Sequence, residues 1–444
     1  MSTILSLAAE LAAGRTTSVE LTERALARIA DPCGEGTRAF TRVDREGALK
    51  AAQASDLLRA AGVVPSPLAG IPVSVKDLFD VAGQPTPAGS LVLKDAPPAV
   101  RDAPVVARLR AAGAVIVGRT NMTEFAFSGL GVNPHYGTPG NPFDRARIPG
   151  GSSSGAAVSV ADGMAVAAVG SDTGGSVRIP SAFCGLVGFK PTQARVPRDG
   201  AVPLSWTLDT VGPLARSVAC CAIMDAVMAG QAPTVPDAAE MDGLRIAVPK
   251  NIVLDGMDAT VAAAFRRALA ALSRAGARVV EIDLAVLERI PQVNAKGGFS
   301  PPEAYAWHRE LLERAGDRYD PRVRVRILRT HEQSAADYIE LTRARASLIA
   351  QADAATRAFD ALAMPTAPVV APRFAELADD ADYARINVLA LRNPSLWNFL
   401  DRPAVSLPMA SDGPPAGLML VGKRGHDRNL LRIARAAEPV VRQG

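Results

Sequence analysis

The pattern of apolar and polar positions predicts helices alternating with strands. Residues 1–60 have the spacing of amphipathic helices, and the segment SVELTERALARI starts at Ser18, a candidate N-cap. The short β-branched run IPVSV lies between a glycine and a charged pair, which predicts a strand that ends at Lys76. VVARLRAAG followed by AVIVGRT then predicts a helix, a glycine stop and a second strand.

The remainder of the chain repeats this alternation. GMAVAAVG, GLVGFKPT, LRIAVP, ARVVEIDL, DALAMPTAP, RPAVSLPM and AGLMLVG are predicted strands, residues 300–360 are predicted to be helical, and a last helix is predicted near Asp427. Such alternation indicates an α/β fold whose parallel or mixed sheet is covered on both faces. Residues 231–243 are the best linker candidate, but the strands beyond them still need a shared sheet, so a single domain is expected.

Residues 128–155 interrupt the alternation, because they are rich in Gly, Pro, Asn and Ser. A loop of this length inside a compact domain is usually functional. It ends in GGSSSG, where Gly151 to Gly155 match the G-x-S-x-G elbow that would make Ser153 a nucleophile. That elbow needs a strand directly before it, and the preceding NPFDRARIP cannot be a buried strand, so this interpretation is disfavoured.

Composition narrows the classes of function. Basic and acidic residues nearly balance, 49 against 45, and no long run of like charge occurs. The densest basic stretch, Arg318–Arg329, is typical of a solvated helix face, so no nucleic-acid partner is expected. No apolar run is long enough for a membrane span, which favours a cytoplasmic protein without a membrane partner. The four cysteines and four histidines lack metal-ligand spacing, so a structural or catalytic zinc is not expected.

The segment GSDTGGSVR carries a second candidate nucleophile, Ser176. A predicted strand delivers the chain to two glycines, and Ser176 opens the next predicted helix. Successive N–H groups at 173–176 can then point into one concavity and stabilise the anion that forms when a carbonyl is attacked. Taken alone, the segment fits an ordinary glycine-rich turn equally well.

Lys76 supplies a candidate base. Most lysines at strand ends are solvated, but Lys76 has apolar neighbours on both sides, and burial lowers the pKa of a lysine enough to make it a neutral base. Adjacent strand residues point to opposite faces, so Asp77 need not neutralise it. No histidine has a distinctive context, whereas a serine–lysine pair is a known variant of the catalytic triad.

Together these segments resemble the amidase-signature family. The resemblance covers about residues 5–435, is strongest over 65–215, and rests on Gly150–Pro191, GIPVSVKD, TNMTEFAFSGLGVNPHYGTPGNP and WTLDTVGPLARSV. It implies that Ser176 is the nucleophile, that Ser152, 24 residues earlier and after a cis peptide bond, relays the proton, and that Lys76 is the base. It further implies an oxyanion hole from the N–H groups of Thr173, Gly174, Gly175 and Ser176, and supporting roles for Ser153, Asp172 and Arg178.

The resemblance also implies the fold and the reaction. The expected fold is a single α/β/α domain over residues 1–444 with a mixed, mostly parallel sheet of about eleven strands. Its parts are a helical segment (about 1–60), a signature core (about 65–215) and a variable pocket region (about 290–402). The expected activity is an amidase that hydrolyses a small non-peptide carboxamide, with aryl amides, esters or carbamates as further substrates. The resemblance also implies that neither a metal nor a cofactor is needed. Many family members are homodimers, so a homodimer is a further expectation.

The substrate pocket is the least defined prediction. Its candidate residues are Phe125, Phe127, Ser128, Gly129, Trp307 and Trp397, although Phe125 and Trp397 also fit the core. Arg392 and Arg402 are candidates for binding a substrate carboxylate. Two other functions remain open: the glutaminase (A) subunit of a tRNA-dependent amidotransferase, for which the chain is rather short, and an inactive binding protein, which the intact Lys–Ser–Ser set disfavours.

Overall fold

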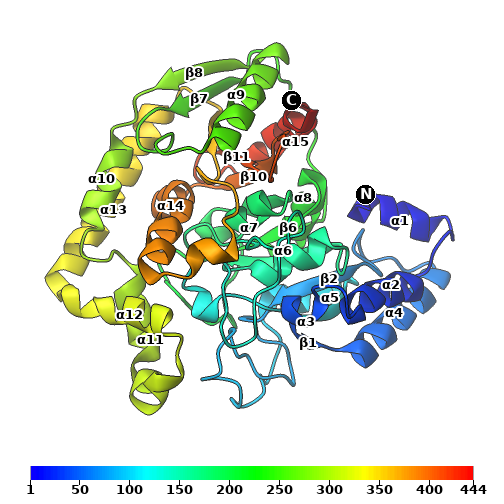
Figure 1. Cartoon of the computed structure of the whole chain (residues 1–444). Helices are drawn as coiled ribbons and strands as arrows, with labels where there is room; N and C mark the ends of the chain where they lie inside the picture. Colours follow the sequence, from blue (N-terminus) through cyan, green and yellow to red (C-terminus); the bar gives the residue numbers. More distant parts are fainter. Residues whose placement is uncertain (1, 444) are drawn as a thin grey trace.

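The computed structural model describes residues 2–443, and its centre is one sheet of eleven strands (Figure 1). The strands are β1 (Phe40–Val43), β2 (Pro72–Lys76), β3 (Val115–Thr120), β4 (Ala167–Asp172), β5 (Val187–Lys190), β6 (Thr210–Ala215), β7 (Arg245–Pro249), β8 (Arg278–Ile282), β9 (Ala361–Pro365), β10 (Ala404–Pro408) and β11 (Gly417–Val421). Their spatial order is β1-β3-β2-β4-β6-β5-β10-β11-β9-β7-β8, so strands from both sides of residues 231–243 share the sheet.

The predicted α/β class and the eleven-stranded mixed sheet are confirmed, but the balance of directions differs from the expectation. Within residues 2–443, the parallel pairs are only β2–β3, β2–β4, β7–β8 and β7–β9. The other six pairs are antiparallel, so the sheet is not mostly parallel. The reason lies in its centre, where β10 and β11 form a hairpin through residues 409–416 and every pair from β4 to β9 is antiparallel.

Helices cover both faces of the sheet (Figure 1). They are α1 (Ile4–Ala12), α2 (Ser18–Ala30), α3 (Gly36–Ala39), α4 (Arg45–Ala60), α5 (Pro104–Ala111), α6 (Ser154–Ala161), α7 (Arg178–Phe183), α8 (Val218–Met228), α9 (Ala259–Arg274), α10 (Val286–Val293), α11 (Ser300–Ala315), α12 (Pro321–Leu328), α13 (Ala335–Thr356), α14 (Asp380–Phe399) and α15 (Asp427–Gln443). Buried side chains of α1, α5, α8, α9 and α15 share one hydrophobic cluster, whereas Ala156, Ala157 and Val160 of α6 lie in a second one. Ile179 and Phe183 of α7 lie in a third.

The N-terminal segment differs from its prediction in two details. It contains a strand, β1, which pairs with β3 at the edge of the sheet. The sequence did not predict this strand, because four residues are too few to form a recognisable pattern. The N-cap of α2 is Thr17 rather than Ser18, because Thr17 and Glu20 form a reciprocal capping box. Ser18 is the first helical residue, and its hydroxyl donates to the carbonyl oxygen of Gly70 at 3.0 Å.

Residues 127–153 contain neither helix nor strand, as the sequence predicts. Hydrogen bonds from buried asparagine side chains fix this long loop, which lacks the regular backbone hydrogen bonds of a helix or strand. The amide of Asn141 donates to the carbonyl oxygens of Ile148 and Phe183 at 3.0 and 2.9 Å. The amide of Asn133 donates to those of Gly89 and Met122 at 2.8 and 2.7 Å. The loop is therefore a fixed part of the interior, and it delivers the Ser152 segment to the end of the sheet.

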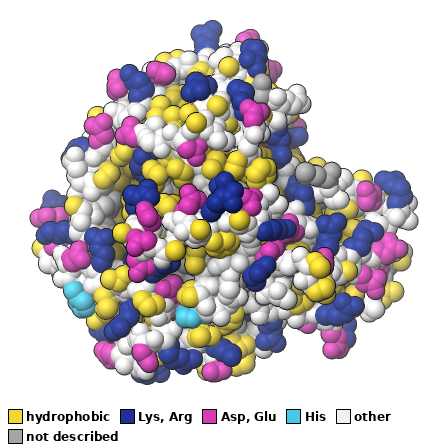
Figure 2. Space-filling view, viewed as in Figure 1, with side chains coloured by type: hydrophobic (Ala, Val, Ile, Leu, Met, Phe, Trp, Pro, Cys, Tyr) yellow, Lys and Arg dark blue, Asp and Glu magenta, His cyan; other side chains and the backbone are white. Residues whose placement is uncertain are grey.

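Charges of both signs are interspersed over the face shown in Figure 2. Several arginines of the basic stretch 318–329 have local partners. Arg322 pairs with Asp380 at 2.7 Å, and Arg318 donates to the carbonyl oxygen of Leu91 at 2.6 Å. No helix within residues 2–443 is both long enough and apolar enough to cross a membrane.

Candidate active site

Lys76 lies at the buried end of β2, beside the end of β4. These two strands are parallel neighbours, so their C-terminal ends meet at one edge of the sheet. The Lys76 Nζ atom lies 2.7 Å from Ser152 Oγ and 2.8 Å from Ser171 Oγ. Burial lowers the pKa of Lys76 to about 7, although the negative charges of Asp172 and Asp209 oppose this shift. A substantial fraction of Lys76 is therefore neutral at pH 7 and able to accept a proton.

Asp77 points away from Lys76, as the alternation along a strand predicts. Its carboxylate pairs with the Nε atom of Arg119 at 3.0 Å, and both side chains are almost completely buried. The guanidinium of Arg119 also donates to the carbonyl oxygens of Asp77 and Phe79 at 2.9 and 2.7 Å. The charge of Asp77 is thus balanced on the far side of the strand.

The Ser-rich segment joins Lys76 to the Ser176 turn. The Gly151–Ser152 peptide bond is cis, as the resemblance predicts. A Cβ on Gly151 would lie 2.5 Å from the nitrogen of Gly131, so no larger residue fits there. The Ser153 N–H donates to the carbonyl oxygen of Ser176 at 3.3 Å. Lys76, Ser152 and Ser176 are thereby held by three segments that meet at one edge of the sheet.

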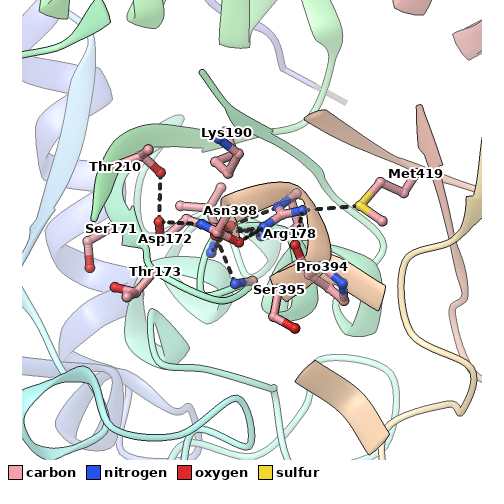
Figure 3. Close-up of polar contacts among 12 residues, drawn as sticks. Ser171, Asp172, Thr173, Arg178, Lys190, Thr210, Pro394, Ser395, Asn398 and Met419 are labelled. Atoms are coloured by element: carbon pink, nitrogen blue, oxygen red, sulfur yellow. Dashed lines mark hydrogen bonds and ion pairs between the residues drawn. The ribbon is translucent and has the colours of Figure 1, made fainter. Parts of the chain in front are cut away.

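A buried ion pair fixes the turn that follows β4 (Figure 3). The Asp172 carboxylate accepts from Arg178 at 2.8 Å, and both side chains are fully buried. It also accepts from the Asn398 amide at 3.0 Å, and the Asp172 carbonyl accepts from Thr210 at 2.7 Å. Burial alone raises the pKa of Asp172, but Arg178 and Asn398 outweigh it and hold that pKa well below its usual range. Asp172 therefore stays ionised and organises the turn.

The four expected oxyanion N–H groups are not equivalent. That of Gly175 donates to Asp172 Oδ1 at 2.8 Å, so it is already used inside the turn. Among residues 2–443 no acceptor receives a hydrogen bond from the N–H groups of Thr173, Gly174 or Ser176, and these three residues line a cavity. Gly175 has φ +132°, and a Cβ there would lie 2.7 Å from Pro394 Cβ, so both its geometry and its space require glycine.

The cavity beside Ser176 has a volume of about 410 Å³ and mostly apolar walls. Phe127 and Ser128 line it, as predicted. Gly129 supports the wall instead, since its N–H and the Ser128 hydroxyl both donate to Asn387 Oδ1, at 2.9 and 2.8 Å. The other lining side chains come mainly from residues 290–300 and from α14, within the region expected to vary, and include Leu208, Ile252, Ile290, Phe299, Arg326, Leu391, Arg392 and Phe399.

The other predicted pocket residues lie elsewhere. Phe125 packs in the core, with ring centroids 4.4 Å from His308 and 5.3 Å from Tyr319. Trp397 is fully buried, and its Nε1 donates to Met364 Sδ at 3.0 Å. Neither ring lines the cavity beside Ser176, because each fills space between elements of the core.

Arg402 is also absent from the cavity walls, because it pairs with Asp353 at 2.7 Å. Trp307 lines a second cavity of about 530 Å³ instead.

The second cavity shares Thr173 with the first and contains residues that the sequence did not single out. Ser171, a partner of Lys76, lines it together with Asp209. Burial raises the pKa of Asp209 to about 6, although its bond from the Thr173 hydroxyl at 2.6 Å opposes this shift. Ser171 could have been recognised as the position one before Asp172 on a predicted strand. Asp209, Asn387 and Asn398 carried no local signal of their own.

No group of three or more His, Cys, Asp or Glu side chains within residues 2–443 is placed to share a metal ion. Cys184, Cys220 and Cys221 are buried free thiols, and burial raises the pKa of each. Cys33 is exposed and also free.

Comparison with known proteins identifies the family. The sequence profile described as Amidase matches residues 20–431. The chain belongs to the amidase family. The predicted resemblance is thus confirmed, and the whole of the motif region from Lys76 to Arg178 lies within the match.

Relatives in this family have different activities. The chain is 39% identical to a 2-amino-5-chloromuconic acid deaminase of Comamonas testosteroni, over 91% of this chain and 89% of that protein. It is 37% identical to the A subunit of the glutamyl-tRNA(Gln) amidotransferase of Chloroflexus aggregans, over 97% and 94%.

Solved family structures share the fold. A crystal structure of an amidase superposes with a TM-score of 0.89 at 34% identity and covers 99% of this chain and 100% of that one. The native peptide amidase of Stenotrophomonas maltophilia superposes with a TM-score of 0.83 at 30% identity, covering 99% and 97%.

Proposed function

We propose that this chain is an amidase that hydrolyses the C–N bond of a small non-peptide carboxamide through a Ser176 acyl-enzyme. One observation carries the proposal: a fully buried lysine with a pKa of about 7 lies 2.7 Å from the hydroxyl of Ser152. The Ser152 segment is in turn bonded to the Ser176 turn beside an open cavity. A base, a relay and a nucleophile in this order are what acyl transfer needs when no histidine is present.

Acylation begins with attack of Ser176 Oγ on the carbonyl carbon. Ser176 gives its proton to Ser152, and Ser152 gives its own proton to neutral Lys76, which becomes an ammonium. The carbonyl oxygen takes the negative charge and is stabilised by the N–H groups of Thr173, Gly174 and Ser176. Loss of one such donor costs on the order of 3–4 kcal/mol of activation free energy.

The intermediate collapses when the C–N bond breaks. The leaving nitrogen takes a proton from Ser152, which is reprotonated by Lys76, and ammonia or an amine departs. Water then attacks the ester, and its proton passes through Ser152 to Lys76. Ser176 recovers a proton along the reverse path as the carboxylic acid leaves, so Lys76 ends neutral.

The cavity supports a small acyl group. A volume of about 410 Å³ is at the lower end of the range for pockets that hold small ligands, and walls such as Leu391 and Phe299 offer apolar contact. Aryl amides, esters and carbamates present the same carbonyl to Ser176, so we propose them as further substrates.

The second candidate function is the glutaminase component of a tRNA-dependent amidotransferase. Its support is the 37% identity to the A subunit of such an enzyme. The chain spans 94% of that relative, so length does not separate the two candidates. Dependence on partners separates the two candidates, because a stand-alone amidase hydrolyses amides as the purified chain and does not prefer glutamine.

The test is a substrate panel on the purified chain. Aliphatic amides, anilides, ureas, carbamates and glutamine are assayed for release of ammonia or amine, and added hydroxylamine traps the acyl group as a hydroxamate. Ser176→Ala is expected to abolish both signals, Lys76→Ala nearly so, and Ser152→Ala to lower turnover by several orders of magnitude while leaving a trace.

Ser154→Ala is the matched control. Its hydroxyl lies in the same segment and donates only weakly, to the Asn121 carbonyl at 3.4 Å, so turnover should be kept. Substantial hydrolysis by Ser176→Ala contradicts the assignment. A folded wild type that binds amides without any turnover supports an inactive binding protein instead.

A further inference from the structure

The cavity beside Ser176 contains two positive charges and no negative one. Arg326 of α12 and Arg392 of α14 both line it, and both are half-buried. No Asp or Glu of residues 2–443 lines it, and most of the remaining wall is aliphatic or aromatic. Two guanidinium groups in a mostly apolar pocket are a poor fit for a wholly apolar acyl group.

Neither arginine has a carboxylate partner within residues 2–443. Arg326 donates to the carbonyl oxygen of Phe127, and its Cζ atom lies 5.5 Å from the centre of the Tyr383 ring. Arg392 donates to the carbonyl oxygen of Asp255 at 2.7 Å and to Asn393 Oδ1 at 3.1 Å. These contacts hold each guanidinium in place but leave its charge without a counter-ion.

Neighbouring arginines show the contrast. Arg322, one turn before Arg326 on the same helix, pairs with Asp380 at 2.7 Å, and Arg385 of α14 pairs with Asp382 at 2.8 Å. Neither of these paired residues lines the cavity.

Two acidic residues are close to the unpaired arginines without compensating them. Burial lowers the pKa of Arg326 and of Arg392, and the charges of Asp320 and Asp255 respectively oppose this shift. Neither acidic side chain forms a salt bridge with its neighbour or lines the cavity. A partly desolvated cation without a partner is costly, and an anion that enters the cavity removes that cost.

We infer that the substrate is the monoamide of a small dicarboxylic acid, whose free carboxylate is recognised by Arg326 and Arg392. The inference rests on the proposed function, since it places the amide carbonyl at Ser176. The hydrocarbon between the two groups packs against walls such as Leu391 and Phe299. Planar guanidinium groups match the geometry of a carboxylate, which makes arginine suited to this task.

The experiment compares charged and neutral substrates of the same length. Succinamate, glutaramate and adipamate are assayed against the diamides succinamide, glutaramide and adipamide, and the readout is the ratio of kcat/KM for each acid to that for its diamide. Wild type is expected to favour the acid of the best length. Arg326→Gln and Arg392→Gln keep a donor for the backbone carbonyls, and each should lower the ratio by about 10- to 100-fold, as loss of a hydrogen bond to a charged group does.

Arg322→Gln and Arg385→Gln are the matched controls and should leave the ratio unchanged. A wild type that favours the diamides overturns the inference, and so does an equal loss on both substrates in the two cavity variants, which indicates a structural role.

A binding measurement separates this inference from the proposed function. Titration calorimetry of Ser176→Ala with glutarate and with glutaramide is expected to show tighter binding of glutarate, weakened by Arg392→Gln. If wild type cleaves no amide but glutarate binding has this pattern, the proposed function fails and the anion site stands. Without selective glutarate binding, the anion site fails whatever the catalytic result.

Discussion

The pH dependence of hydrolysis is the sharpest test of Lys76 as the base. Only neutral Lys76 can accept the proton from Ser152, so activity requires a pH near or above the pKa of Lys76, which burial lowers to about 7. Activity should therefore be present above pH 7 and be lost as the pH falls through that value. This pH dependence is opposite to that of an enzyme whose essential proton donor is a carboxylic acid, which loses activity as the pH rises.

The magnitude follows from that pKa. At pH 7 about half of the molecules hold neutral Lys76, whereas a lysine with the ordinary pKa near 10.4 is neutral in only about one molecule in 2,500. Below pH 6 the rate should fall about tenfold per pH unit, because the neutral fraction falls by that factor. Burial of this one side chain thus raises the neutral fraction of the lysine at pH 7 about a thousandfold.

The assay is kcat/KM for a neutral aliphatic amide between pH 5 and 9, because such a substrate has no ionisation of its own in this range. Circular dichroism at each pH confirms that the chain stays folded. Lys76→Arg keeps a cation that cannot lose its proton, so it should be inactive at every pH. Asp209→Asn removes a negative charge that raises the pKa of Lys76, so the midpoint of the remaining activity should move to lower pH. A rate that is flat from pH 5 to 9, or that still rises about tenfold per pH unit up to pH 9, refutes a buried neutral lysine.

Three further substitutions test the turn and the core. Asp172→Asn leaves the buried cation of Arg178 without its counter-ion and should lower the free energy of unfolding by about 3–5 kcal/mol in denaturant titration. Gly175→Ala places a methyl group 2.7 Å from Pro394 Cβ at φ +132°, so kcat should fall at least tenfold with a smaller change in thermal stability, measured by kinetics and calorimetry together. Trp397→Ala should cost about 3–5 kcal/mol of stability in the same titration, while the KM of the surviving folded fraction stays near the wild-type value, since the ring does not line the cavity.

The sequence predicts the parts of the site that depend on short segments. Lys76 at a strand end, Ser152 in a Ser-rich loop and Ser176 after two glycines are each encoded within about ten neighbouring positions. The hydrophobic pattern also predicts most strands, because each buried strand is a short apolar run that can be recognised from its own residues.

Features that depend on distant contacts could not be predicted in this way. The N–H of Gly175 was expected in the oxyanion hole, but its acceptor, Asp172, reaches it only through a turn that Asn398 and Arg178 support. Phe125 has φ +48°, and its ring turns into the core rather than to the cavity. Strand directions in the centre of the sheet are likewise set by how the strands assemble, and alternation along one strand does not encode them.

One helix, α14, connects the nucleophile to the substrate pocket. Its C-terminal part supports the turn that carries Ser176. The Asn398 amide donates to the Asp172 carboxylate, and the Pro394 carbonyl oxygen accepts from Arg178. The same helix also forms part of the pocket wall, through residues at helical spacing: Asn387, Leu391, Arg392 and Ser395. Because one rigid element does both, a shift that admits a larger acyl group also moves the support of the Ser176 turn. Changes of specificity made on α14 should therefore alter kcat as well as KM, whereas changes at Phe299, outside this helix, should act mainly on KM.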